Sequence, residues 1–520
     1  MADKIKLFVN GEEVEVEKGK NLVDAVGAVG IEIPHLCYHP ALGADGNCRM
    51  CLVGLEEGGP PLVPACKTPA QEGMKVLLDA EHIRKIQHDV MEFELINHPI
   101  DCPVCDQAGE CKLQDYYMSY DQKESRMTVP QVTKNKKMDF GGGIIHDQER
   151  CIICGRCVRF LRQITKTGEL GIINRTDTTR VNIFPGRPIN NRYGVNVVDL
   201  CPVGAMTSTD FRFKQRVWFL KKALGICHGC SKGCNISVDH NKEKGKDDII
   251  YRFRPRLNEQ VNGYFICDDG RLSYKSENED RLIAARHGKN ERALSDVLTV
   301  CAKEIDKSAK TAILISPDAT LEQMVVVKAL AEKLSASLSG FSDGYILDGD
   351  GDDYLIQDDK AANRAGLALL GIDTDKATFE SNLKEADLFI NFGNDLNLSY
   401  ELSAINNLMG DTKTITCATH DNEYVAQASI TLPIASYSEY SGCIINCDNI
   451  LQQFGKAITK NNELLAICQI AAQLGSPLQR PEEVYAELQQ KIGALKEFQP
   501  ANIPAEGLNL NDSEGANVTA

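Results

Sequence analysis

Cys151-Ile-Ile-Cys154-Gly-Arg-Cys157 is the segment that most constrains the fold of this chain, and Cys201-Pro202 follows it after 43 intervening residues. Three thiolates spaced two residues apart can hold three irons of one cubic cluster, and a distant cysteine can hold the fourth. Zinc sites rarely use three cysteines at this spacing. We therefore predict a 4Fe–4S site, the Cys151 group, with the ligands Cys151, Cys154, Cys157 and Cys201.

An earlier set of cysteines has a different spacing, with a close Cys-x2-Cys pair between one earlier and one later cysteine. This arrangement is typical of plant-type 2Fe–2S sites. Gly43, Gly46 and Gly54 suit a loop whose backbone must pass close to an inorganic core. A structural zinc site is the alternative. The predicted 2Fe–2S ligands, the Cys37 group, are Cys37, Cys48, Cys51 and Cys66.

A third set supplies only three thiolates, because no cysteine lies between Cys111 and Cys151. His98 is the simplest fourth ligand, since imidazole replaces thiolate in Rieske centres. Two alternatives stay open from the spacing alone: His98 could be an ordinary helix-end histidine, with three thiolates holding either an open iron or zinc. The predicted ligands of this 4Fe–4S site, the His98 group, are His98, Cys102, Cys105 and Cys111.

The last set also has 4Fe–4S spacing, although zinc is a stronger competitor here than in the other sets. With it, fifteen cysteines and one histidine give sixteen ligands for four clusters, so no ligand is missing or left over. The predicted ligands of this site, the Cys227 group, are Cys227, Cys230, Cys234 and Cys267.

Composition restricts the function classes. The net charge of -16 argues against nucleic acid, whose phosphates would repel the chain. No apolar run reaches the roughly 18 to 20 residues of a membrane-spanning helix, so we expect membrane contact only through a partner. The N-terminus has neither a secretory apolar core nor an Arg- and Ser-rich transit pattern. We expect a bacterial cytoplasmic protein, and a mature organellar form is also compatible.

Local patterns predict several elements. Asn10-Gly11 between two alternating runs predicts a hairpin with a type I′ turn, and Asn21 is a suitable cap for a short helix. Helical spacing over 81–97 ends at His98-Pro99. Alternating strands and helices further on predict a parallel α/β sheet. Its expected strands are 312–315, 388–392 and 414–417, and its expected helices are 321–334 and 401–409.

These patterns divide the chain into five parts. Residues 1–80 are expected to form a 2Fe–2S domain and residues 81–222 a double 4Fe–4S domain. Residues 223–275 carry the Cys227 group, and 276–498 form the α/β region. The polar tail, 499–520, is expected to be disordered.

Other chemistry-bearing motifs are missing from the sequence. There is no Walker A motif, no complete Gly-x-Gly-x-x-Gly after a strand and no nucleophile elbow. The five remaining cysteines lack a ligand-type set. We therefore predict no catalytic side chain in the chain itself and no nicotinamide fingerprint.

With these residues in hand, the sequence resembles the large iron–sulfur subunit of bacterial respiratory complex I (NADH:quinone oxidoreductase). The resemblance covers residues 1–270 and implies a ferredoxin-like (β-grasp) start, with His98 as a cluster ligand. It also implies that the Cys227 group holds an extra cluster off the main electron path. The stretches that carry it are Ile33-Pro-His-Leu-Cys37, Asn97-His-Pro-Ile-Asp-Cys102, His146-Asp-Gln-Glu-Arg-Cys151 and Asp199-Leu-Cys-Pro-Val-Gly-Ala-Met206.

The C-terminal region is similar to the molybdopterin oxidoreductase fold, through Glu385-Ala-Asp-Leu-Phe-Ile-Asn-Phe-Gly393, Ser429-Ile-Thr-Leu-Pro-Ile-Ala435 and Glu439-Tyr-Ser-Gly442. Only 253 residues follow Cys267, too few for the full set of pterin-binding domains of that family. The resemblance therefore implies a shortened α/β scaffold, and no molybdopterin is expected.

The resemblance implies an electron-transfer subunit of an oxidoreductase and translocase of the respiratory chain. Its implied partners are a flavin-bearing NADH-oxidising subunit and the quinone-side iron–sulfur subunits, and its implied place is the cytoplasmic face of the bacterial inner membrane, as a peripheral protein. One alternative is the iron–sulfur subunit of a NAD-linked formate dehydrogenase or hydrogenase. Another is a non-redox zinc-binding assembly protein.

Overall fold

The computed structural model of the protein describes residues 3–56, 62–120, 124–460, 464–497 and 503–512. The chain divides into two compact units, residues 1–220 and 221–520. Each unit has hydrophobic clusters of its own. All twenty cysteines are free of disulfide bonds, as expected from a protein that uses cysteines as ligands or buried residues.

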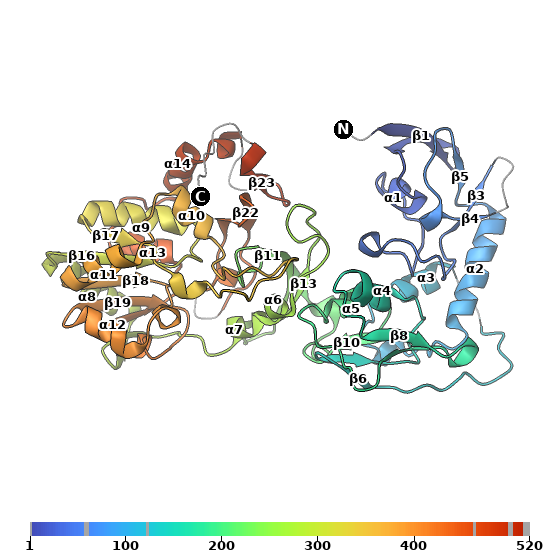
Figure 1. Ribbon diagram of the computed structural model, residues 1–520, viewed down its shortest axis with the longest axis horizontal. Helices are drawn as coiled ribbons and strands as arrows, with labels where there is room; N and C mark the ends of the chain where they lie inside the picture. Colours follow the sequence, from blue (N-terminus) through green and yellow to red (C-terminus); the bar gives the residue numbers. More distant parts are fainter. Residues whose placement is uncertain (1–2, 57–61, 121–123, 461–463, 498–502, 513–520) are drawn as a thin grey trace. The chain divides into compact units, whose positions relative to one another are not determined.

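The N-terminal part folds around a five-stranded sheet in the order β2-β1-β5-β3-β4 (Figure 1). Asn10 and Gly11 join β1 to β2 with φ angles of 51° and 90°, the left-handed values of a type I′ turn. The Asn21 side chain accepts a hydrogen bond of 3.1 Å from the Asp24 amide and caps α1. The predicted hairpin and short helix are thus confirmed. The elements are β1 (Lys4–Val9), β2 (Glu12–Glu17), α1 (Leu22–Gly27), β3 (Leu52–Leu55), β4 (Val63–Pro64) and β5 (Lys75–Leu77).

Helix α2 begins at Glu81 and ends at Leu95, which confirms the helix predicted before His98-Pro99. It buries Ile83 and Met91, while the residue before a proline disfavours helical backbone and so limits the helix. The rest of this unit consists of short elements between the cysteines. They are α3 (Lys112–Tyr120), β6 (Met138–Gly141), β7 (Ile144–His146), α4 (Arg156–Gln163), β8 (Leu170–Ile173), β9 (Arg180–Ile183), α5 (Asn196–Leu200) and β10 (Met206–Ser208).

The second unit begins with an antiparallel sheet in the order β11-β12-β13, followed by two short helices. Its strands are long enough to pair over most of their length, with Ala223 opposite Val238 and Val238 opposite Phe253. The elements are β11 (Lys221–Ile226), β12 (Asn235–Lys242), β13 (Asp248–Pro255), α6 (Asp268–Leu272) and α7 (Tyr274–Asn278).

A seven-stranded sheet in the order β15-β14-β20-β19-β18-β16-β17 forms the centre of the second unit. The five strands from β17 to β20 are parallel, and their sequential numbers read 2-1-3-4-5 from the β17 edge, an order found in doubly wound folds. The predicted parallel sheet is confirmed. Its strands are β14 (Ala285–His287), β15 (Asn290–Arg292), β16 (Thr311–Ile315), β17 (Ser337–Ser339), β18 (Leu388–Phe392), β19 (Lys413–Ala418) and β20 (Ile430–Pro433).

Helices cover both faces of this sheet, because successive strand residues point to opposite sides. Ile313 and Ile315 of β16 join one hydrophobic cluster with α8, α9, α13 and α14. Ala312 and Leu314 join the other cluster with α11 and α12. A strand buried on both faces explains the continuous apolar run from which it was predicted. The helices are α8 (Leu294–Lys307), α9 (Leu321–Leu334), α10 (Arg364–Leu369), α11 (Lys376–Glu385), α12 (Leu402–Met409), α13 (Ile467–Gln473) and α14 (Pro481–Lys491).

A small sheet in the order β21-β22-β23 includes part of the tail that was expected to be disordered. That expectation is wrong for residues 503–512, whereas 499–502 and 513–520 lie outside the described residues. Leu508 pairs with Leu451 on β22, and Leu510 is 1% exposed. Apolar residues within a polar tail therefore supply enough burial to order this segment. The strands are β21 (Gly442–Ile445), β22 (Ile450–Phe454) and β23 (Leu508–Asn509).

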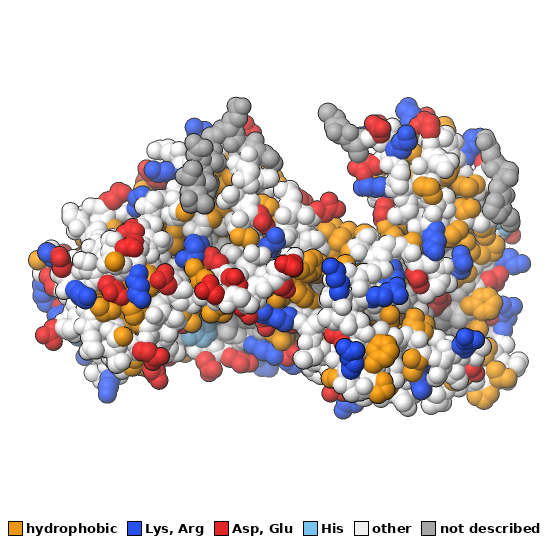
Figure 2. Space-filling view, viewed as in Figure 1, with side chains coloured by type: hydrophobic (Ala, Val, Ile, Leu, Met, Phe, Trp, Pro, Cys, Tyr) orange, Lys and Arg blue, Asp and Glu red, His pale blue; other side chains and the backbone are white. Residues whose placement is uncertain are grey.

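Within the described ranges, no helix has both the length and the apolar character needed to cross a membrane. Acidic and basic side chains are interspersed over the face of the molecule shown in Figure 2.

Candidate metal centres

The Cys37 group lies in the N-terminal domain, and all four of its cysteines are at most 8% exposed. The loop between Cys37 and Cys48 turns back on itself so that the Cys37 amide donates a hydrogen bond of 3.4 Å to the Cys48 sulfur. A side-chain hydrogen bond from Cys48 lowers the pKa of Cys37, against the opposing effect of burial. Cys66 lowers the pKa of Cys51 in the same way. Four sulfurs in two such contacts form a compact donor set that fits a 2Fe–2S cluster.

The His98 group surrounds one small cavity of the first unit. All four predicted ligands line it, together with Leu95, Tyr117 and Gly204. A Cβ atom on Gly204 would overlap the Cys105 sulfur, so this wall of the cavity has no space for a side chain. The structure brings His98 together with its three predicted cysteine partners, although 13 positions separate His98 from Cys111 in the sequence.

The ring of His98 is arranged as a metal ligand requires. Nδ1 is buried and has no hydrogen-bond partner among the described residues. The backbone of Arg150 lies close enough to the ring to oppose part of the effect of burial on the pKa of His98. Burial lowers the pKa of His98 to about 4, so the ring is neutral at physiological pH. A neutral imidazole that donates through one nitrogen keeps a lone pair on the other for a metal.

The Cys151 group surrounds a second cavity, which His146 and Arg156 also line. Ile153 and Gly155 have φ angles of 53° and 74°, and these left-handed residues fold the short Cys-x2-Cys-x2-Cys segment around the cavity. Burial raises the pKa of all four thiols, so thiolates would need a metal or cations nearby. Backbone amides after Cys201 partly offset this rise in the pKa of Cys201, by donating hydrogen bonds to its sulfur.

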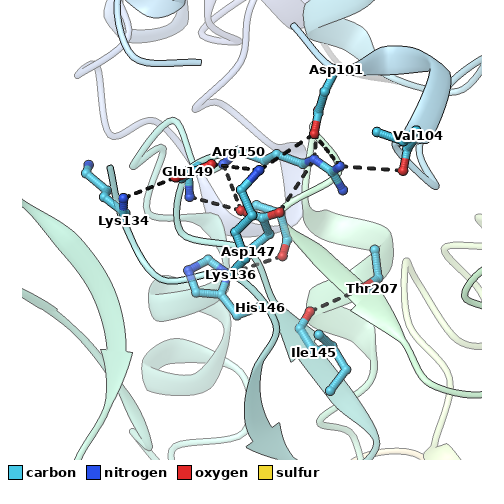
Figure 3. Close-up of polar contacts among 11 residues, drawn as sticks. Asp101, Val104, Lys134, Lys136, Ile145, His146, Asp147, Glu149, Arg150 and Thr207 are labelled. Carbon is cyan, nitrogen blue, oxygen red and sulfur yellow. Dashed lines mark hydrogen bonds and ion pairs between the residues drawn. The ribbon is translucent and has the colours of Figure 1, made fainter. Parts of the chain in front are cut away.

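An ionic network joins the backbone on either side of these two cavities (Figure 3). Arg150, next to Cys151, forms an ion pair of 2.6 Å with Asp101, next to Cys102. Arg150 also lies 3.6 Å from a carboxylate oxygen of Asp147. Because Arg150 adjoins Cys151 and its guanidinium pairs with Asp101 beside Cys102, this ion pair links the ligand segments of the two sites.

The Cys227 group lies in the second unit, within the loops that follow β11 and precede α6. The Gly229 amide donates to the Cys227 sulfur at 3.4 Å, and the Gly270 amide donates to the Cys267 sulfur at 3.3 Å. A Cβ atom on Gly270 would lie 2.9 Å from the Cys227 sulfur. Amide donors to sulfur and a glycine beside it are features that favour a bound cluster.

Three of the four groups lie close together in the first unit. One hydrophobic cluster contains Cys37 and Cys48 together with Cys111 and Cys154. The Cys111 thiol donates a hydrogen bond of 3.7 Å to the carbonyl oxygen of Pro202, the neighbour of Cys201. The Cys201-Pro202 segment, which completes the Cys151 group, therefore also contacts a predicted ligand of the His98 group.

Gly204 and Arg156 are site residues that the sequence interpretation did not single out. Arg156 is visible in the sequence as a cation between Cys154 and Cys157, and Gly204 follows Cys201-Pro202. Because both residues lie beside predicted ligands, either could have been recognised from the sequence as a candidate site residue. Their contacts with Cys105 and with the Cys37 loop, however, join segments far apart in the sequence.

Three family descriptions match the first unit. Residues 2–80 match a 2Fe-2S iron-sulfur cluster binding domain. Residues 87–126 match the NADH-ubiquinone oxidoreductase-G iron-sulfur binding region. Residues 141–207 match the ferredoxin-like domain of NADH-quinone oxidoreductase subunit 3. Regions of the 2Fe-2S and 4Fe-4S binding type are therefore present in this protein.

Curated relatives carry names of the same kind. The G subunit of the NADH-quinone oxidoreductase of Rickettsia conorii is 36% identical over 340 residues, 64% of this chain and 50% of the relative. The NADH-ubiquinone oxidoreductase 75 kDa subunit of Reclinomonas americana is 36% identical over 64% of this chain and 48% of the relative. The sequence thus spans about half the length of these relatives.

One solved structure, of an NAD+-reducing [NiFe]-hydrogenase in the H2-reduced state, is 25% identical with a TM-score of 0.36, over 41% of this chain and 91% of that chain. The matched regions and the curated relatives agree in their names. By its matched iron–sulfur regions and by 36% identity over 340 residues, this protein is similar to the G subunits of the NADH-quinone oxidoreductases.

Proposed function

We propose that this protein is an electron-transfer subunit of an NADH:quinone oxidoreductase and that it holds four iron–sulfur clusters. When bound, such clusters accept and release single electrons. The Cys37 group would hold a 2Fe–2S cluster, and the other three groups would each hold a 4Fe–4S cluster. The proposed ligands are the sixteen residues predicted above, with His98 completing the set that has three cysteines.

The observation that carries this proposal is the packing of three ligand groups into one unit. Cysteines of the Cys37, His98 and Cys151 groups share a hydrophobic cluster, and the Cys111 thiol contacts the Pro202 carbonyl at 3.7 Å. Clusters held this way would lie next to one another and away from water. Neighbouring redox groups in a dry interior are what a relay of single electrons requires, whereas isolated structural metal sites need no such proximity.

The residues of this protein would position and tune the clusters. Backbone amides donate to the sulfurs of Cys48, Cys227 and Cys267, and hydrogen bonds of this kind raise cluster potentials. The neutral His98 ring in place of a thiolate would also raise the potential of its cluster. No acid or base is required for the reaction, and we propose no catalytic side chain.

The proposed partners and location follow from the resemblance described in the sequence analysis, and the names of the relatives agree with a subunit of such a complex. We propose that a flavin-bearing, NADH-oxidising subunit supplies electrons and that quinone-side iron–sulfur subunits receive them. The protein would then be a peripheral member of the complex at the cytoplasmic face of the membrane. The proposed domains end at residues 80, 222, 275 and 498.

The C-terminal region is proposed to be a shortened scaffold of the molybdopterin-oxidoreductase type without molybdopterin. The 2-1-3-4-5 order of its parallel strands supports a doubly wound fold. At the carboxyl ends of its strands, where such folds bind ligands, the Asp318 carboxylate instead accepts a 2.7 Å hydrogen bond from the Ala362 amide. The Asn363 side chain donates to the Ala319 carbonyl there at 2.7 Å. Protein groups thus occupy this position, which supports a structural role.

Iron and sulfide counts on the anaerobically purified protein, with EPR, test the proposal. We expect about fourteen irons, from one 2Fe–2S and three 4Fe–4S clusters. A count near ten would remove one 4Fe–4S cluster from the proposal. Stoichiometric molybdenum or tungsten would favour a formate dehydrogenase-like enzyme instead. A colourless protein with zinc and no iron would establish the assembly-protein alternative.

A further inference from the structure

Arg156 lies at a position that links two ligand groups. It is the first residue of α4, and its side chain is only 8% exposed. One guanidinium nitrogen donates to the carbonyl oxygen of Tyr38 at 2.5 Å, and another donates to that of Leu200 at 3.3 Å. Tyr38 follows Cys37, and Leu200 precedes Cys201. The cation therefore lies between the loop of the Cys37 group and the loop of the Cys151 group.

The charge of Arg156 has no carboxylate partner among the described residues. Arg156 instead lines the cavity of the Cys151 group together with Cys154 and Cys201, and its guanidinium contacts the residue that follows Cys37. The buried Arg150 differs, because it pairs with Asp101 and Asp147. A buried charge without a counter-charge is strongly disfavoured. The sulfurs of the two ligand groups are thus the counter-charges available to Arg156.

We propose that Arg156 is a positioning residue shared by two clusters, the 2Fe–2S cluster of the Cys37 group and the 4Fe–4S cluster of the Cys151 group, and that its positive charge raises the reduction potential of both. This inference rests on the proposed function. Reduction adds one electron to a cluster and breaks no bond, and Arg156 keeps its protons throughout. A fixed cation in a dry interior stabilises the more negative, reduced form.

Arg159 provides a matched control on the same helix. It is 6% exposed, and it donates to the carbonyl oxygens of Leu42 at 3.0 Å and Gly43 at 2.8 Å, and also to that of Cys37. All three acceptors belong to the loop of the Cys37 group. A substitution of Arg159 therefore removes a buried arginine of equal size without removing a contact to the loop of Cys201.

The experiment is an EPR-monitored redox titration of the full-length protein, purified anaerobically, after an iron and sulfide count. We expect Arg156→Gln to keep its irons and to lower the potentials of both the 2Fe–2S cluster and the Cys151-group cluster. Arg156→Lys should return both potentials towards the wild-type values, because it keeps the charge. The clusters of the His98 and Cys227 groups should not shift. Arg159→Gln should leave the potential of the Cys151-group cluster unchanged.

Unchanged potentials in a fully loaded Arg156→Gln variant would overturn the inference, and so would an equal fall in all four clusters. If Arg156→Gln does not retain its clusters, the redox titration of Arg156→Lys tests the inference instead. Wild-type potentials in the loaded Lys variant support the role of the charge, whereas potentials that fall in that variant contradict it. A wild-type protein lacking either cluster contradicts the proposed function instead, and the iron count reveals that before any titration.

Discussion

At the scale of single residues, the surroundings of His98 support the ligand role that we propose for it. Its Nδ1 atom is buried and unpartnered within the described part of the chain, and the residue lines a cavity with three cysteines. An unpaired buried nitrogen is costly unless a metal or a donor completes it.

This arrangement leads to a prediction for two substitutions of His98. His98→Ala should remove the fourth ligand and lower the iron count by about four. His98→Cys should retain about fourteen irons, and the potential of that cluster should fall because thiolate donates more charge than imidazole. Iron analysis and redox titration measure both effects. His88→Ala, a histidine substitution on α2 that leaves the cavity intact, is the control. Full iron content in His98→Ala would show that the histidine is not a ligand.

At the scale of elements, the connection between α5 and β10 forms a wall common to two sites. Cys201 begins it, the Pro202 carbonyl accepts the hydrogen bond from Cys111, and Gly204 lies against the Cys105 sulfur. A short connection between two ordered elements can hold a backbone this close to a thiol, because both of its ends are fixed. The same connection therefore shapes the Cys151 group and the His98 group.

A methyl group on Gly204, in this connection, should disrupt the His98 group more than the Cys151 group. Gly204→Ala places a Cβ atom on top of the Cys105 sulfur, which forces the thiol to move. We expect the cluster of the His98 group to be lost, with about four irons, while the EPR signal of the Cys151-group cluster persists. Gly27→Ala, where a Cβ meets no atom within 4 Å, should change neither. If Gly204→Ala removed only the signal of the Cys151-group cluster, the conclusion that Gly204 shapes the His98 group would be contradicted.

At the scale of the whole molecule, the protein consists of two compact units with separate cores. Three ligand groups lie in residues 1–220, and the Cys227 group lies with the doubly wound sheet in residues 221–520. Phe389, on β18, is fully buried against Phe379 of α11 in the second unit. A weakened core in one unit should therefore affect that unit first.

Calorimetry of the full-length protein should show this independence. Phe389→Ala removes a buried aromatic ring and should cost about 3–5 kcal/mol, so the transition of the second unit should move to lower temperature. The EPR signals of the Cys37 and Cys151 groups should persist at temperatures between the two transitions. Phe93→Ala is the control, because Phe93 is 73% exposed. A single transition that shifts as a whole would contradict the separation into two units.

Local features of this protein follow from its sequence alone. The Asn10-Gly11 turn and the cap at Asn21 depend on interactions within a few residues, and the buried strands at 312–315 and 388–392 are marked by continuous apolar runs; the structure has them all. The spacing of cysteines is local in the same sense, because a short peptide segment can present only a few ligand geometries. The expectation of disorder was wrong for residues 503–512, because packing against β22 outweighed the polar composition of this segment.

Contacts between distant segments set how the sites relate to one another, and only the folded chain reveals them. Folding places Arg156 on the Tyr38 carbonyl, Gly204 on the Cys105 sulfur and Cys111 on the Pro202 carbonyl. These pairs are 118, 99 and 91 positions apart, beyond the reach of any local pattern. Folding also places His98 in one cavity with Cys102, Cys105 and Cys111, a placement that the spacing had left open. The candidate ligands were thus predicted from the sequence alone, whereas the neighbours that would tune and connect them depend on the packing of distant segments.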